Sequence, residues 1–184
     1  ALMKQGIPTV TGTTGWLDEL AQVQTLVDDN SGALLWGSNF SIGVNVLFQA
    51  NRQLAKLMNR YSQYDVFVEE RHHKYKKDSP SGTARTIAED IVDRIDRKSK
   101  FVLSDAYAHR PPEPEELTLG VIRTGEIPGT HTIGYNSGVE QITLQHQAFG
   151  REGFALGAVI AAEWLSKGSK GVFAFHELFE QGEL

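Results

Sequence analysis

The first 36 residues alternate between short apolar runs and a segment with helical periodicity, and this order constrains the fold more than any other feature. Ile7–Val10 is an apolar run that predicts a short buried strand, and a Gly-rich turn follows at Thr11–Gly15. The amphipathic pattern of Trp16–Asp28 predicts a helix, and the run ALLW at Ala33–Trp36 predicts a second buried strand. Strand, helix and strand in this order are typical of an α/β domain.

Helical and strand patterns also divide the rest of the chain. Apolar residues recur at helical spacing over Ile42–Tyr61 and from Ala84 to Ile95, which predicts two helices. Between them, Asp65–His73 is rich in Val and Phe and favours a strand. Further on we expect a proline-rich loop at Ala108–Glu116. Three strands should follow, at Leu117–Thr124, His131–Tyr135 and Val139–Gln147, and then a last long helix around 154–165. The apolar tail VFAFHELF is expected only to pack. The order is therefore an α/β segment, a β-rich middle and a returning helix.

Charge and cysteine content exclude several classes of protein. The 184 residues carry a net charge of −5, so the chain as a whole is not a nucleic-acid binder. It contains no cysteine, which excludes disulfides, zinc–thiolate sites and thiol catalysis and fits a reducing compartment. No apolar run approaches the roughly 18 residues that a membrane span needs. We therefore expect a cytoplasmic protein whose partners are neither nucleic acid nor membrane.

One segment, RHHKYKKDSPSGTA at Arg71–Ala84, concentrates groups that could carry chemistry. Ser79 can cap the helix that follows, and Pro80 suits the first position of that helix. Ser81–Thr83 then lie in the first turn, where backbone N–H groups have no partner within the helix and two hydroxyls add donors. This arrangement predicts an anion site. Judged by composition alone, a plain helix start whose N–H groups face water explains the same residues.

Basic residues precede this turn. Side chains alternate between the two faces of a strand, so His72, Lys74 and Lys76 share one face. An ammonium group beside helix N–H groups forms a two-part clamp for a carboxylate. A histidine nearby changes its protonation near pH 7 and could donate a proton during a reaction. Two alternatives stay open: a solvated basic edge of a strand, and a metal site, which three nearby cations would disfavour.

This segment resembles the signature of the 4-hydroxy-tetrahydrodipicolinate (dihydrodipicolinate) reductase family. That signature is Glu-x-His-His, x-x-Lys-x-Asp and Ala-Pro-Ser-Gly-Thr-Ala, and the chain has Glu70-Arg71-His72-His73, then Lys76 and Asp78, then SPSGTA. Ser79 replaces alanine and Tyr75 stands where many members have histidine, but neither change removes a group that the chemistry needs. Four further motifs resemble the family in the same order: GTTGW at Gly12–Trp16, SNFSIGVN at Ser38–Asn45, IRTGEIPGTHTIGY at Ile122–Tyr135 and REGFALGAVIAAEWL at Arg151–Leu165.

The resemblance implies an enzyme with a nicotinamide cofactor. The family reduces 4-hydroxy-tetrahydrodipicolinate, a cyclic unsaturated dicarboxylate, to tetrahydrodipicolinate with NADH or NADPH, in the diaminopimelate route to lysine. By this resemblance His72 is the general acid, and Lys76 assists catalysis and binding. The residues that would hold a substrate carboxylate are His73, Ser81, Gly82 and Thr83. Those near the nicotinamide end of the cofactor would be Gly12, Thr13, Thr14, Ser38, Asn39 and Phe40.

The resemblance also implies a fold and an assembly. The expected fold is α/β and α+β, with an incomplete Rossmann-like nucleotide domain at 1–39 and 151–184 and a substrate-binding and oligomerisation domain at 40–150. The second domain would be a mixed β-sheet with helices on one face, and the assembly a homotetramer. No Gly-rich phosphate loop follows a first strand in this sequence. We therefore expect the C-terminal portion of the reductase, and the activity of this chain alone stays open.

Two other functions fit parts of the sequence. A non-catalytic module derived from the reductase would bind a dicarboxylate or form oligomers; the lack of a phosphate loop favours it, whereas His72 and Lys76 argue against it, since a pure binder needs no proton donor. A different reductase of related architecture would act on another carboxylated substrate, but the combination of HHxxK with SPSGT argues against that. Arg123 and His131 lie on the family-like hairpin, and we interpret them as surface polar residues of strands.

Overall fold

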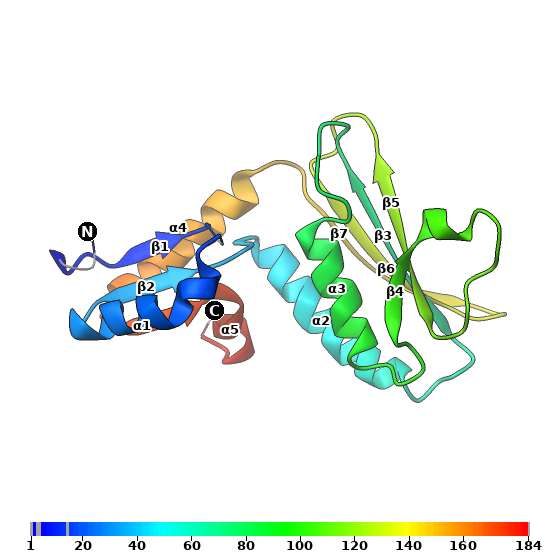
Figure 1. The fold of residues 1–184 in the computed structure, drawn as a ribbon, viewed down its shortest axis with the longest axis horizontal. Helices are drawn as coiled ribbons and strands as arrows, with labels where there is room; N and C mark the ends of the chain where they lie inside the picture. The colour runs from blue at the N-terminus through cyan, green and yellow to red at the C-terminus, as the bar shows by residue number, and fades with distance from the viewer. Residues whose placement is uncertain (1, 3–4, 14, 184) are drawn as a thin grey trace. The chain divides into compact units, whose positions relative to one another are not determined.

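The computed structural model describes residues 2, 5–13 and 15–183, and the chain divides into two compact units. The first unit contains residues 1–45 and 152–184, and the second contains residues 46–151. Each unit has a sheet of its own, and Figure 1 shows the elements of both. That the first unit serves a cofactor and the second a substrate stays a prediction.

A three-stranded parallel sheet forms the centre of the first unit. Its strands are β1 (Thr9–Thr11), β2 (Ala33–Trp36) and β8 (Gly171–Ala174), in the order β1-β2-β8. A 3-10 turn, η2 (Leu17–Glu19), and helix α1 (Leu20–Asp29) connect β1 to β2. Helices α4 (Glu152–Ser166) and α5 (Phe175–Glu180) precede and follow β8. The apolar run ALLW forms β2 without polar alternation, because β2 is the central strand and both of its faces are covered.

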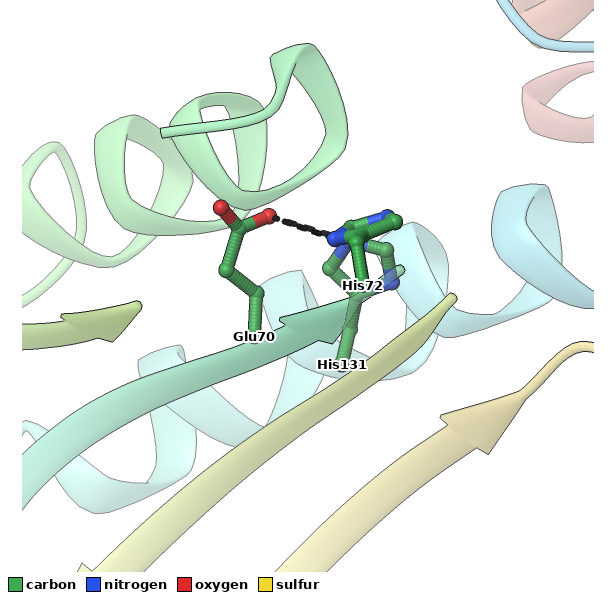
Figure 2. A group of neighbouring side chains, drawn as sticks. All are labelled: Glu70, His72 and His131. Atoms are coloured by element: carbon green, nitrogen blue, oxygen red, sulfur yellow. Dashed lines mark ion pairs between the residues drawn. The ribbon is translucent and has the colours of Figure 1, made fainter. Parts of the chain in front are cut away.

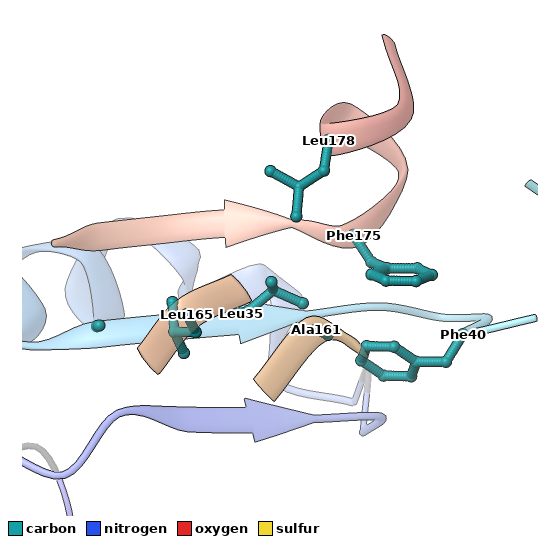
Figure 3. Packing of buried hydrophobic residues seen from close by; sticks show 7 residues of the cluster. Leu35, Phe40, Ala161, Leu165, Phe175 and Leu178 are labelled. Atoms are coloured by element: carbon teal, nitrogen blue, oxygen red, sulfur yellow. The ribbon is translucent and has the colours of Figure 1, made fainter. Parts of the chain in front are cut away.

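The core of the first unit lies where residues of α4 and α5 pack around β2 (Figure 3). Leu35 of β2 is fully buried in one cluster with Leu165 and Phe175. The rings of Phe40 and Phe175 lie 4.8 Å apart between centroids. A Cβ on Gly157 of α4 would overlap the carbonyl oxygen of Phe40, so only glycine allows this close approach. The segment that follows β2 is therefore fixed against α4.

A five-stranded mixed sheet forms the second unit, in the order β4-β5-β3-β6-β7. The parallel pairs are β3 with β5 and β4 with β5, whereas β6 is antiparallel to both β3 and β7. The bounds of the strands are Asp65–His72 for β3, Lys100–Leu103 for β4, Glu116–Arg123 for β5, Thr130–Asn136 for β6 and Gln141–Gln147 for β7. A 3-10 turn, η3 (Ser104–Tyr107), follows β4.

Helix α2 (Ile42–Met58), which begins in the first unit, and helix α3 (Gly82–Val92) cover one face of this sheet (Figure 1). Every second residue of β3 from Val66 to His72 is buried, because these side chains point toward the helices. Asn51 on α2 donates from Nδ2 to the carbonyl of Ile87 on α3 at 3.2 Å, which joins the two helices. None of the described helices is both long and apolar enough to cross a membrane.

The predicted fold class, α/β and α+β with a mixed sheet, is confirmed. The bounds of β2 match the prediction, and those of α2 and β3 differ only at their ends. The sequence pattern missed β4, and it indicated only a packed tail where the structure has β8 and α5. These elements have four to six residues, too few for either periodicity to show. Strand β2 is equally short, but three consecutive residues of it are buried and it was predicted as an apolar run, without periodicity.

Candidate active site

Four side chains from three neighbouring strands meet on the helix-covered face of the larger sheet. Glu70 and His72 lie two residues apart on β3, so both point to this face. His72 is paired across the sheet with Arg123 of β5, and Glu70 is paired with His131 of β6. Paired residues point to the same side of a sheet, so the register gathers all four. Figure 2 shows Glu70, His72 and His131 facing one another.

Glu70 is the fully buried carboxylate at the centre of this cluster. One oxygen, Oε1, accepts from Arg123 Nη2 at 2.7 Å and from the backbone N–H of Ser81 at 3.0 Å. The other, Oε2, lies 3.4 Å from Nδ1 of His72, longer than an ordinary hydrogen bond. Burial acts to raise the pKa of Glu70, but the interactions with His72, Ser81 and Arg123 outweigh burial and hold that pKa well below its usual range. Glu70 is therefore ionised at neutral pH.

His131 is a neutral histidine next to this charge. Its ring lies 5.2 Å from the ring of His72 between centroids, in an edge-on arrangement. The pKa of His131 is lowered to about 4, chiefly by burial and further by the nearby His72. Its Nε2 shares a hydrogen bond with Ser81 Oγ at 3.2 Å. The cluster thus contains one permanent negative charge, one permanent positive charge and two imidazoles.

Helix α3 begins directly beside Glu70, and its start differs from the prediction. Ser79 was expected to cap the helix, but the N-cap is Ser81, whose Oγ accepts from the N–H of Ala84 at 3.2 Å. The cap lies two residues later because Ser81 also donates its own N–H to Glu70, which fixes it in an extended conformation. Gly82 and Thr83 are then the first helical residues, and a Cβ on Gly82 would meet no atom within 4 Å. The helix N-terminus is open to a ligand at this point.

The loop between β3 and α3 carries the other predicted site residues of this unit. Lys76 is half-buried, and its Nζ lies 2.8 Å from a carboxylate oxygen of Asp78. This contact is the main cause that lowers the pKa of Asp78. The backbone N–H of Lys76 donates to the carbonyl of His73 at 3.1 Å, and Arg123 Nη2 donates to the carbonyl of Asp78 at 2.9 Å. Arg123 therefore ties this loop to Glu70.

The predicted cofactor residues lie in the first unit, after two adjacent parallel strands. Gly12 and Thr13 follow β1, and Ser38–Phe40 follow β2, so both segments lie at the same edge of the sheet. Gly12, Thr13 and Ser38 are exposed, whereas Phe40 is buried and its ring lies 3.7 Å from the place of a Cβ on Gly12. The Phe40 ring thus packs against the turn at Gly12. Thr14 lies outside the described residues.

Comparison with known proteins identifies the family. Residues 43–179 match the family described as "Dihydrodipicolinate reductase, C-terminus". The 4-hydroxy-tetrahydrodipicolinate reductase of Christiangramia forsetii is 41% identical over 175 residues, which cover 95% of this chain and 70% of the relative. The chain belongs to the dihydrodipicolinate reductase family. The reductase of Methanocorpusculum labreanum is 36% identical over 95% of the chain and 67% of that relative. The resemblance stated from the motifs is confirmed.

A solved structure shares the fold. It is a dipicolinate-bound dihydrodipicolinate reductase from Paenisporosarcina sp. TG-14, with a TM-score of 0.70 over 94% of this chain and 64% of that chain. At 24% identity the likeness shows the fold alone. The chain spans 64% to 70% of the length of these members of the dihydrodipicolinate reductase family.

Three residues of the cluster received no role from the sequence. Arg123 and His131 were interpreted as surface residues, which is wrong: His131 is 5% exposed, and Arg123 contacts the buried Glu70. Glu70 is part of the dihydrodipicolinate reductase motif, and its spacing of two from His72 could have placed both on one face. Arg123 and His131 gave no such signal, because their positions depend on pairing between strands far apart in the sequence.

The described residues include one group that could hold a metal ion, formed by Glu70, His72 and His131, with ligand atoms within 4.8 Å of one another. Arg123, however, already places a positive charge 2.7 Å from Glu70. Lys76 adds a second cation, close enough to contribute to the lowered pKa of His131. These two cations disfavour a metal ion in this group.

Proposed function

We propose that this chain binds a cyclic dicarboxylate beside His72 and protonates it, in the reduction of 4-hydroxy-tetrahydrodipicolinate to tetrahydrodipicolinate in lysine biosynthesis. The observation that carries the proposal is the buried His72, 3.4 Å from the ionised Glu70, next to the open N-terminus of α3. The reductase relatives support the class of reaction. The dipicolinate bound to the structural neighbour supports the class of ligand.

Different residues of the site would bind the substrate and transfer the proton. The Ser81 hydroxyl and the backbone N–H groups of Gly82 and Thr83 would bind one carboxylate, because the Ser81 N–H already donates to Glu70. The open space at Gly82 lets the carboxylate approach. Lys76 and His73 would add donors to the same anion. His72 would donate a proton to the ring as general acid. The nicotinamide cofactor, when bound, supplies the hydride.

We propose NADH or NADPH as the cofactor, with its nicotinamide end held by Gly12, Thr13, Ser38 and Asn39. The exposed turn residues after β1 and β2 lie at the carboxyl ends of parallel strands, where α/β folds bind ligands. Gly12 offers backbone without a side chain in the way. Phe40 would act by supporting Gly12, since its own ring is buried.

We also propose a homotetramer in the cytoplasm. The helices cover one face of the larger sheet, and its other face carries apolar side chains such as Ile122, which is more than a third exposed, and the half-buried Phe67. Burial of these side chains against another copy would stabilise an assembly. Light scattering tests this step, and a strictly monomeric protein would contradict it. The cytoplasmic location follows from the biosynthetic role of the family.

The absorbance of reduced nicotinamide tests the proposed reaction. We expect substrate-dependent oxidation of NADH or NADPH when freshly made 4-hydroxy-tetrahydrodipicolinate is added, and we expect His72→Gln to lower turnover by about 10²- to 10⁴-fold. Dipicolinate binding, followed by calorimetry, should survive the substitution. Saturable dipicolinate binding without turnover would instead support a non-catalytic dicarboxylate-binding module. Absence of both would refute the proposal.

A further inference from the structure

Glu70 contacts both parts of the proposed site, the general acid and the anion-binding turn. Its Oε1 accepts the N–H of Ser81, at the start of α3, and its Oε2 faces Nδ1 of His72. We propose that Glu70 is a positioning residue that keeps the hydrogen of His72 on Nδ1, so that Nε2 is the nitrogen that donates a proton to the substrate. This inference rests on the proposed function and deepens it.

The charge of Glu70 suits this role. Arg123 lies 2.7 Å from its Oε1, and the depressed pKa keeps the carboxylate ionised across the neutral range. An ionised carboxylate can only accept hydrogen bonds, so it favours a ring nitrogen that carries hydrogen. It does not take that proton during the reaction, because its conjugate acid is far stronger than an imidazolium. Nδ1–H of His72 therefore stays in place while Nε2 exchanges its proton.

Packing fixes the other side of the ring. A Cβ on Gly129 would lie 3.1 Å from Nε2 and 3.4 Å from Cδ2 of His72. The backbone before β6 therefore approaches the ring closely, and a side chain at this position would crowd Nε2. Glu70 on one side and Gly129 on the other hold the imidazole in a single orientation.

His131 faces the same oxygen of Glu70 but does not compete for it. Its Nε2 lies 3.7 Å from Oε2 and 3.2 Å from Ser81 Oγ. With its pKa lowered to about 4, chiefly by burial, His131 is neutral near pH 7. Arg123 is bound to the other oxygen, so His72 is the group that Oε2 orients.

The proposed proton transfer balances. The Nε2–H bond of the His72 imidazolium breaks, and that hydrogen forms a bond to the substrate ring. His72 becomes a neutral imidazole with its remaining hydrogen on Nδ1, beside Glu70. Water returns a proton to Nε2 before the next turnover, and the nicotinamide supplies the hydride.

The first test reads the tautomer of His72 directly. Nitrogen-15 NMR of the histidine rings distinguishes a nitrogen that carries hydrogen from one that does not, and the His72 signals are assigned by their loss in His72→Gln. We expect the neutral His72 ring to carry its hydrogen on Nδ1. In Glu70→Gln the side-chain amide donates to Nδ1 instead of accepting from it, so we expect the hydrogen to move to Nε2.

The second test is kinetic. We expect Glu70→Gln to lower kcat by about 10²-fold or more, because the wrong nitrogen then carries the hydrogen. The dissociation constant of dipicolinate should stay within about threefold, since the groups that bind the anion remain. Glu116→Gln is the matched control: Glu116, the first residue of the neighbouring strand β5, is 3% exposed and lies 2.7 Å from Arg110. The control should change neither the His72 tautomer nor kcat.

Several outcomes decide the matter. Hydrogen on Nε2 in the unsubstituted chain, or no change of tautomer in Glu70→Gln, would overturn the inference. If Glu70→Gln does not fold, the nitrogen-15 spectrum of the unsubstituted chain still shows which nitrogen of His72 carries the hydrogen. Gly129→Ala should in addition shift the His72 ring signals. If His72 carries its hydrogen on Nδ1 but the chain shows no turnover, the role of Glu70 in orienting His72 is supported and the proposed reaction is refuted. Failure of the inference and failure of the proposed function can therefore be told apart.

Discussion

Single residues matter most where a charge is buried. Glu70 has no exposed surface, and the Arg123 guanidinium lies 2.7 Å from its carboxylate. The same strand carries a second ion pair, between Arg71 and Glu69, on its other face, where the Arg71 side chain is 47% exposed. The two pairs therefore have different energetic weight, because solvent screens the exposed pair and leaves the buried one unscreened.

We expect Arg123→Met to destabilise the second unit by about 3–5 kcal/mol, because it leaves Glu70 buried without its cation. Hydrogen exchange of the β3 amides measures this loss. Arg71→Met is the control and should cost at most about 1 kcal/mol. Equal effects of the two substitutions would show that Arg123 does not neutralise Glu70.

The motif residues were predictable at this scale, and their partners were not. The sequence pattern alone placed His72 and Ser81–Thr83 in one segment, and the structure brings His72 and Ser81 to the same carboxylate. Their catalytic and binding roles stay predictions. Arg123 and His131 lie about 50 and 60 residues further along the chain, and strand register, which depends on long-range packing, brings them to Glu70.

The length of a helix or strand decides whether its sequence pattern can be recognised. Helices α2 and α3 have long apolar stripes and were predicted, whereas β4, β8 and α5 are too short for their periodicity to be seen. The start of α3 was misplaced by two residues, because the cap is selected by a tertiary contact with Glu70 and not by local sequence. Local propensity thus predicted which elements exist better than where they begin.

Helix α4 offers a matched pair of glycines. A Cβ on Gly157 would overlap the backbone of Phe40, whereas a Cβ on Gly153 would meet only Ser41 Oγ, at 4.0 Å. We expect Gly157→Ala to destabilise the first unit by about 2 kcal/mol or more. Gly153→Ala should be neutral or stabilising by up to about 1 kcal/mol, since alanine favours a helix. Tryptophan fluorescence follows this unit, and a harmless Gly157→Ala would contradict the close packing of α4.

The whole molecule has two units that different probes report separately. Trp16, Trp36 and Trp164, all the tryptophans of the chain, lie in the first unit. The buried cluster of Glu70 and His131 lies in the second unit. Fluorescence therefore reports the unit with the proposed cofactor residues, and amide exchange on β3 reports the unit with the proposed acid.

Acid should destabilise the second unit in two stages. The folded-state pKa of His131 is about 4, below the unfolded value of about 6.5, so its contribution is complete above pH 6.5 and is lost as the pH falls toward 4. This loss amounts to about 3 kcal/mol. Glu70, whose pKa is also depressed, adds a further loss below about pH 4.3.

Substitution of His131 tests the first of these stages, and substitution of an exposed histidine is the control. His131→Gln should remove most of the loss of stability between about pH 6.5 and 4, measured by amide exchange. His109→Gln, which changes an exposed histidine, should leave the pH dependence as it is. An unchanged slope in His131→Gln would show that His131 is not buried in its neutral form.

The most direct measurement is a titration of the chain with dipicolinate, followed residue by residue in amide NMR spectra. We expect saturable binding with shifts concentrated at Lys76 and at Ser81–Ala84. Lys76→Met should weaken binding by about tenfold or more, and Lys77→Met, which removes an exposed neighbour, should not. Shifts confined to the first unit, or no saturable binding at all, would contradict the placement of a dicarboxylate site beside His72.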